Sequence, residues 1–202
     1  MIAATEIHRD DQASKFGMWL FLFTEMLLFG GLFIVYSVYR YRNAGAFHLA
    51  SEELSVSIGT INTIILLVSS ATIAMSITAI RKRDKRTSLM LLGTTTLLGL
   101  LFLLNKYFEW GEHFRQQIYP GSSALALRGQ GDVLFFGLYF FMTGLHALHI
   151  IIGVTIIIVV MTFISRGRIH SDRYSVLENG ALYWHLVDLI WIFLFPLFYL
   201  IT

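Results

Sequence analysis

Thirty-two consecutive residues, 133–164, read VLFFGLYFFMTGLHALHIIIGVTIIIVVMTFI and include no Asp, Glu, Lys or Arg. An α-helix rises about 1.5 Å per residue and the hydrocarbon core of a bilayer is roughly 30 Å thick, so about twenty apolar residues are enough to cross it. The run therefore predicts a membrane-spanning helix. It is longer than one crossing needs, and we expect it to tilt or to project beyond the membrane.

Four more apolar runs flank this one and have the length of a membrane span. They are residues 16–38, 56–80, 89–110 and 179–201. The sequence thus predicts an all-α fold, a polytopic bundle of five transmembrane helices. We expect one domain, residues 16–202, after a cytoplasmic N-terminal segment of residues 1–15.

The run at residues 89–110 is the least uniform of the five, because it is strictly apolar only as far as Leu104. Asn105, Lys106 and Glu109 follow in its last turns. We expect these turns to lie in the headgroup region, where the neighbouring aromatic residues suit an interfacial belt.

Composition excludes several classes of function. Of the 202 residues, 56% are hydrophobic and 15% aromatic, which indicates lipid rather than water as the solvent. The formal net charge of +2 does not favour nucleic acid as a partner. The chain has no cysteine, so disulfides, thiolate metal sites and iron–sulfur clusters are excluded. The charged first fifteen residues do not resemble a cleavable secretory signal.

Basic residues predict the orientation. Of the 15 Lys and Arg residues, ten fall on the side of the N-terminus and five on the other side. By the positive-inside rule we expect a cytoplasmic N-terminus and a periplasmic C-terminus. A cluster after the second span contributes half of the ten: Arg81, Lys82, Arg83, Lys85 and Arg86. We favour a topology signal as the role of this cluster over specific recognition of lipid headgroups, although attraction to anionic headgroups accompanies either role.

Ionisable residues stand inside the spans, where a charge costs several kcal/mol and needs a partner or a task. Glu25 and Asp188 each lie nine residues into spans that run in the same direction, so we expect them at similar depth. His146 and His149 share one helix face, and His149 falls near the middle of its span.

Two interpretations of Glu25, His149 and Asp188 follow. As a structural cluster they would join three helices through hydrogen bonds, and as a functional cluster they would move protons or hold a metal. We favour the structural interpretation, since such bonds are common between membrane helices. His146, His185 and Glu178 are supporting candidates, the last two as interfacial hydrogen-bonding groups. The histidines are too scattered to predict a metal site, and no catalytic residue is predicted.

Five segments taken in order carry a resemblance to a known family. They are GMWLFLFTEMLLFGGLF, INTIILLVSS, LLGLLFLLNKYFEW, FFMTGLHALHIIIG and YWHLVDLIWIFLF. The fourth resembles the TGxHxxHVxxG helix, and the fifth the WHxVDxxWxxLF terminal helix, of subunit III of the haem-copper terminal oxidases. The resemblance covers nearly the whole chain.

This resemblance implies an accessory subunit without a redox centre, working in the bacterial inner membrane in aerobic respiration. The partners would be a subunit I with haem and copper and a subunit II, which holds copper in a cytochrome c oxidase. Family members support proton uptake, protect the catalytic subunit and bind phospholipid. Glu25 matches the family's carbodiimide-reactive glutamate, His149 the second His of its HxxH and Asp188 the Asp after its WH pair. Larger members have two further helices before the first span, and their lipid cleft is formed with these two helices. For such a cleft to form here, another subunit would have to supply them.

The resemblance leaves the electron donor open. Five-helix members occur in cytochrome c oxidases and quinol oxidases, and a related protein is associated with nitric oxide reductases. Glu25 fits the cytochrome c branch better, because an aspartate is usual in the quinol branch.

Two other classes of function remain. A small proton-coupled transporter could use Glu25, His149 and Asp188 as a relay, but the chain lacks evident inverted repeats and broken spans. Transport by the purified chain in liposomes would favour it. A membrane metalloenzyme would show stoichiometric iron or zinc in the isolated chain.

Overall fold

The computed structural model describes residues 2–201, with side-chain surroundings from Gln12 onward. Within this part the fold is all-α, as predicted, and the only β-type pairing is an isolated bridge between His170 and Arg173. The elements in chain order are α1 (Ile2–Arg42), α2 (Ala44–Glu52), α3 (Val56–Arg81), α4 (Lys85–Arg115), α5 (Ser123–Arg128), α6 (Gln130–Ser165), α7 (Ser175–Phe195) and the π-helical turn η1 (Pro196–Leu200).

The five predicted spans are confirmed. Five of these helices are long and apolar enough to cross a membrane, namely α1, α3, α4, α6 and α7 with its π-helical end. Most of them extend beyond the predicted ranges, because a helix does not stop where its apolar part stops. α1 runs without a break through residue 16, so the division between residues 1–15 and 16–202 stays a prediction.

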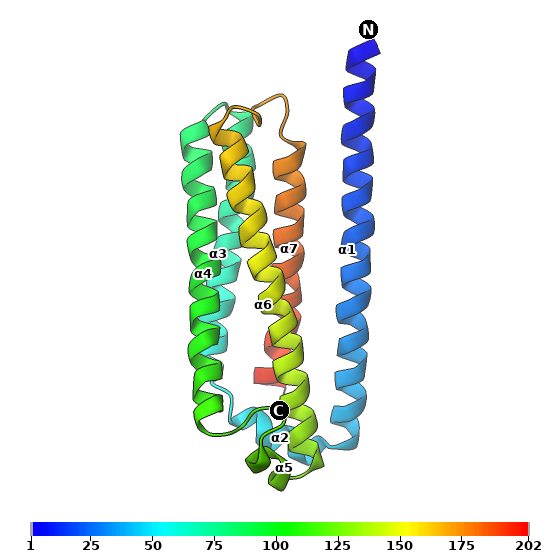
Figure 1. Ribbon diagram of the computed structural model, residues 1–202, viewed down its shortest axis with the longest axis vertical. Coiled ribbons are helices and arrows are strands. Elements are labelled where there is room, and N and C mark those ends of the chain that lie inside the picture. The colour runs from blue at the N-terminus through cyan, green and yellow to red at the C-terminus, as the bar shows by residue number, and fades with distance from the viewer. Residues whose placement is uncertain (1, 202) are drawn as a thin grey trace.

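Four of the long helices form a compact bundle, and the fifth lies at its edge (Figure 1). α3 pairs with α4, while α6 and α7 pack against each other and against that pair. Trp184 of α7 fills the centre, where its ring meets two glycines. A Cβ atom at Gly99 would lie 2.7 Å from the Trp184 ring, and one at Gly153 would lie 2.8 Å from it. The indole therefore determines how closely α4 and α6 approach α7.

α1 contributes little to the common core. It contacts α6 and α7 along one side only, and most of its apolar side chains are exposed. Gly17, Gly30 and Gly31 have open space where a Cβ atom would stand. α1 is thus a lipid-facing or partner-facing helix attached to a four-helix core.

The two ends of the bundle differ. The start of α1, the α3–α4 turn and the α6–α7 loop lie at one end, and the short helices α2 and α5 lie at the other with η1 (Figure 1). Serine side chains cap two of the elements, since Ser55 accepts from Ile58 N and Ser122 from Leu125 N. Asp84 caps α4 by accepting from Thr87 N, and hydrogen bonds from the side chain and the backbone of Thr87 lower the pKa of its carboxyl.

Candidate functional site

Glu25 and His149 meet across the seam between α1 and α6. His149 Nε2 lies 3.0 Å from Glu25 Oε2, and the two side chains are 8% and 16% exposed. On its other side, the ring's Nδ1 lies 2.8 Å from the carbonyl oxygen of Leu145. A carbonyl can only accept, so Nδ1 carries a proton. The Nε2–Oε2 bond then holds one further proton, located on the imidazole or on the carboxyl group.

Aromatic residues fix the position of the His149 ring. Phe29 of α1 meets it edge-on at 5.4 Å between centroids, and Tyr183 of α7 stacks on it at 6.4 Å. The Tyr183 hydroxyl also donates to the His149 carbonyl oxygen at 3.2 Å. Three helices therefore converge on this pair, and α7 reaches it through Tyr183.

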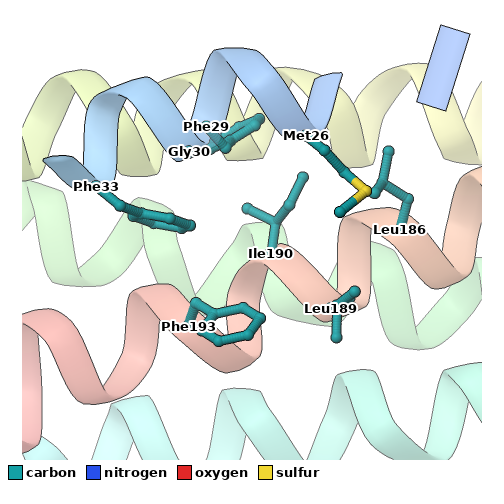
Figure 2. Close-up of a pocket in the computed structure, with 8 residues that line it drawn as sticks. All are labelled: Met26, Phe29, Gly30, Phe33, Leu186, Leu189, Ile190 and Phe193. Carbon is teal, nitrogen blue, oxygen red and sulfur yellow. The ribbon is translucent and has the colours of Figure 1, made fainter. Parts of the chain in front are cut away.

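Asp188 lies on a different face of α7 from the one that meets α1. Figure 2 shows the side chains of an apolar groove in part of the α1–α7 seam. The groove has a volume of about 200 Å³. It is lined by Met26, Phe29, Gly30 and Phe33 from α1 and by Leu186, Leu189, Ile190 and Phe193 from α7.

Asp188 belongs to the α7 face that packs on α3. Trp184 and Trp191, one turn away on either side, donate from their indole nitrogens to Ser69 and Thr63 of α3. The Asp188 carboxyl lies near Ser70 and is 3% exposed, but neither oxygen has a hydrogen-bond partner among the described residues. The structure thus brings Glu25 and His149 together, whereas no hydrogen bond or ion pair described for residues 12–201 joins Asp188 to either of them.

His146 lies one turn from His149 and is fully buried. Its ring packs against Phe102 of α4 and Trp191 of α7, with centroids at 5.5 and 5.3 Å. Neither ring nitrogen has a hydrogen-bond partner in the described chain. The histidine is held by aromatic packing alone.

Glu178 lies at the end of the bundle that holds the α3–α4 turn, and His185 lies two turns further into α7. Glu178 accepts from Lys15 of α1 and from Arg81 of α3, both at 2.8 Å, so its carboxylate ties three helices together. His185 Nδ1 lies 2.6 Å from the hydroxyl oxygen of Ser70, near the middle of α3. Glu178 thus joins helix ends, whereas His185 joins two helices within the bundle.

Two members of the basic cluster at residues 81–86 have intramolecular partners. Arg81 binds Glu178 and lies over the Tyr174 ring at 5.0 Å, and Lys85 donates to the Ser165 carbonyl oxygen at 2.7 Å. Arg81 and Lys85 therefore hold helix ends in place, independently of any lipid headgroup that binds to the cluster.

A second buried polar centre forms at the other end of the bundle. Lys106 Nζ donates to Glu109 Oε2 at 3.0 Å, to the Tyr199 hydroxyl at 2.7 Å and to the Tyr139 hydroxyl at 3.3 Å. Both tyrosine hydroxyls in turn donate to Glu109 Oε1. The Lys106 ammonium also lies about 5 Å from the ring centroids of Tyr139, Trp191 and Tyr199. Every proton of the ammonium is matched, so the charge pair is stabilised inside the bundle.

This centre shows where the side chains of Lys106 and Glu109 lie, while the depth of these turns in the membrane stays a prediction. Lys106 is 2% exposed and Glu109 is 5% exposed, so both side chains are enclosed by protein. Asn105 is also directed inward and donates to Asn62 of α3 at 2.8 Å. The partners that make burial possible come from α6 and η1, far along the chain, and hydropathy alone does not reveal them.

A sequence signal for this centre did exist. Lys106, Glu109 and His113 recur at three and four residues, which places them on one face of a helix. All three are buried, and the His113 ring packs against Phe136 and Tyr139. In a helix that is otherwise apolar enough to span a membrane, ionisable residues on one face indicate that this face packs against the other helices.

Both polar centres hold helices together through hydrogen bonds, and neither has the arrangement of a reaction site. Among residues with described side chains, no three His, Asp or Glu groups converge in a way that could hold a metal ion. The Glu25–His149 pair can hold and exchange a proton. The Lys106 centre is closed by its own hydrogen bonds.

The family match and the similar proteins agree on one family. Residues 8–202 match the family described as "Cytochrome c oxidase subunit III". Cytochrome c oxidase subunit 3 of Thermostichus vulcanus is 31% identical, over 100% of this chain and 94% of that protein. A probable quinol oxidase subunit 3 of Staphylococcus haemolyticus is 27% identical, over 95% and 90%. A heme-copper oxidase subunit I+III of Aeropyrum pernix is 30% identical, over 91% of this chain and 22% of that longer protein.

Proposed function

Since the chain belongs to the cytochrome c oxidase subunit III family, we propose that it is the accessory subunit III of a cytochrome c oxidase. In this role the chain carries no catalytic centre of its own. Haem and copper belong to a partner subunit I, and further copper to a subunit II. The observation that carries this proposal is the family match over almost the entire chain, together with five spans that the structure confirms.

A subunit I is the partner with the most direct support. The relative from Aeropyrum pernix is named subunit I+III, and this chain aligns with 22% of it. Sequences that are parts of one chain in one organism commonly work as neighbours in another. The exposed side of α1 offers a surface for such a neighbour, because most of its apolar side chains are exposed.

The geometry of the two polar centres supports a stabilising role. Lys106 and Glu109 hold α4, α6 and η1 together, and Glu25 with His149 attaches α1 to α6. A rigid scaffold of this kind stabilises a catalytic neighbour and keeps it active over many turnovers. The Glu25–His149 pair, with its exchangeable proton, supports the associated proposal that the subunit assists proton uptake.

We place the protein in the bacterial inner membrane with the N-terminus in the cytoplasm. The concentration of Lys and Arg at that end supports this orientation. Bound phospholipid is proposed along the exposed apolar helices, with headgroups near Lys82, Arg83 and Arg86. The relatives include subunits of quinol oxidases, so a quinol is the alternative electron donor.

Purification from the native membrane through a tag on this chain tests the proposal. A haem-bearing polypeptide of larger mass should copurify, and the complex should oxidise reduced cytochrome c faster than it oxidises a quinol. The isolated chain should show no Soret absorbance. Recovery of the chain alone, as a stable monomer, would contradict the assignment, and preference for quinol would change the donor but not the family role.

A further inference from the structure

Asp188 carries a buried carboxyl group for which the described residues provide no hydrogen bond of normal geometry, although the Ser70 hydroxyl lies near it. Its side chain is 3% exposed, and both carboxyl oxygens lack a hydrogen bond within the described chain. Leaving such a group unpaired in an apolar interior costs roughly 1–3 kcal/mol or more. Native structures usually satisfy such groups with ordered water when the protein does not. The carboxyl therefore indicates a hydrated position.

A row of polar side chains leads from this carboxyl toward the end of the bundle that carries the N-terminus. Asp188 lies near the Ser70 hydroxyl, which is 2.6 Å from His185 Nδ1. His185 lies one turn from Asp188 on α7, and Glu178 lies two turns beyond His185 on the same face. Ser70 and His185 are both partly exposed.

A cavity lies at the outer part of this row. It has a volume of about 390 Å³, and α1, α3 and α7 contribute its lining. Three lining residues are ionisable, Lys15, Glu178 and His185, and four are apolar, Trp19, Ile77, Ala181 and Leu182. The groove between α1 and α7 has only apolar residues in its lining. The cavity is large enough for water, and its three ionisable side chains are groups to which water can bond.

We propose that this cavity is a water-filled inlet, which admits water from the side of the N-terminus past His185 and Ser70 to Asp188. The ion pairs of Glu178 with Lys15 and Arg81 form its mouth. The inlet gives a carboxyl deep in the bundle contact with the aqueous phase without a path through lipid. The inference does not depend on the electron donor of the complex.

The absence of cysteine makes the inlet accessible to a chemical test. Single substitutions Ser70→Cys and His185→Cys would be introduced into the chain in its complex, with Ser76→Cys as the matched control. Ser76 lies on the same helix, about 9 Å nearer the same end, but it is fully buried away from the cavity. Membranes would be treated from each side with the small anionic reagent sulfonatoethyl methanethiosulfonate, and labelling of this chain followed by mass spectrometry.

If the inlet holds water, Ser70→Cys and His185→Cys should react at least about ten times faster than Ser76→Cys, because only a hydrated thiol forms the reactive thiolate. The reaction should occur from the side of the N-terminus only. Copurification of the haem-bearing partner would show which variants assemble, and His185→Cys keeps the test valid if Ser70→Cys does not.

Two results would overturn the inference. Equal reaction of Ser70→Cys and Ser76→Cys would show that depth, and not an inlet, controls access. Failure of both Ser70→Cys and His185→Cys to react with the anionic reagent, in variants that copurify with the haem-bearing partner, would show that water does not fill the cavity.

Discussion

The ionisable pair in the four-helix core and the pair at the edge helix α1 have different surroundings. In the core, Lys106 and Glu109 are enclosed by two tyrosine hydroxyls and three aromatic rings, and every donor is matched. At the edge, Glu25 and His149 share a single bond and keep partial exposure. A charge in the core thus has hydrogen-bond partners from several helices, while the bond at the edge joins only α1 and α6, with an aromatic contact from α7. We expect the core to tolerate substitution less than the edge.

The largest effect should come from breaking the core pair. Glu109→Gln leaves the Lys106 ammonium without its counter-charge, and removing one partner of a buried pair costs about 3–5 kcal/mol. The thermal midpoint at which the chain dissociates from its complex should fall sharply. Glu112→Gln is the matched control, since Glu112 is exposed on the same helix with Arg115 as its partner, and it should change little.

A double substitution sharpens this prediction. Lys106→Met with Glu109→Leu removes both charges, and the Tyr139 and Tyr199 hydroxyls, 3.4 Å apart, can still bond to each other. Much of the lost stability should return. A double variant as unstable as the single variant would show that the residues act by shape and not as a charge pair.

An intermediate effect should follow from filling space at Gly99. A Cβ atom there meets the buried Trp184 ring, which cannot shift easily because its nitrogen is bonded to Ser69. Gly99→Ala should therefore cost about 1–3 kcal/mol. Gly31→Ala on α1 meets nothing within 4 Å and should be neutral or slightly stabilising. Thermal denaturation of the two variants compares core and edge directly, and equal losses would contradict the distinction.

The smallest effects should come from the edge pair, where two substitutions of Glu25 differ. Glu25→Leu leaves His149 Nε2 unsatisfied and should cost about 1 kcal/mol, the low end of the range for a buried group, because the pair keeps partial exposure. Glu25→Gln keeps a hydrogen bond, so assembly should be nearly normal and sustained oxygen consumption only modestly reduced. A large change in the pH dependence of turnover for Glu25→Gln would indicate proton transfer as the main role of the pair.

The sequence predicts the five spans well, because an apolar run of sufficient length has few alternatives in a membrane. It also identifies Glu25 and His149, because isolated polar residues in such runs need a partner. It does not predict α2 and α5, which are too short to carry a clear period. The Lys106 centre is hidden for a different reason. Its bonds join residues 33 and 93 positions apart, and whether a charge is buried depends on those distant partners.

The π-helical turn η1 is synthesised after the helices that it contacts. Tyr199, in its last residues, completes the hydrogen bonding of Lys106, and Tyr36 donates to the carbonyl oxygen of Leu197 in the same turn. At typical translation rates, a ribosome needs roughly 5 to 20 s to make the 93 residues between Lys106 and Tyr199. During that interval Lys106 lacks its Tyr199 acceptor and Glu109 lacks its Tyr199 donor. A chain truncated before Tyr199 would keep both groups in this incompletely bonded state.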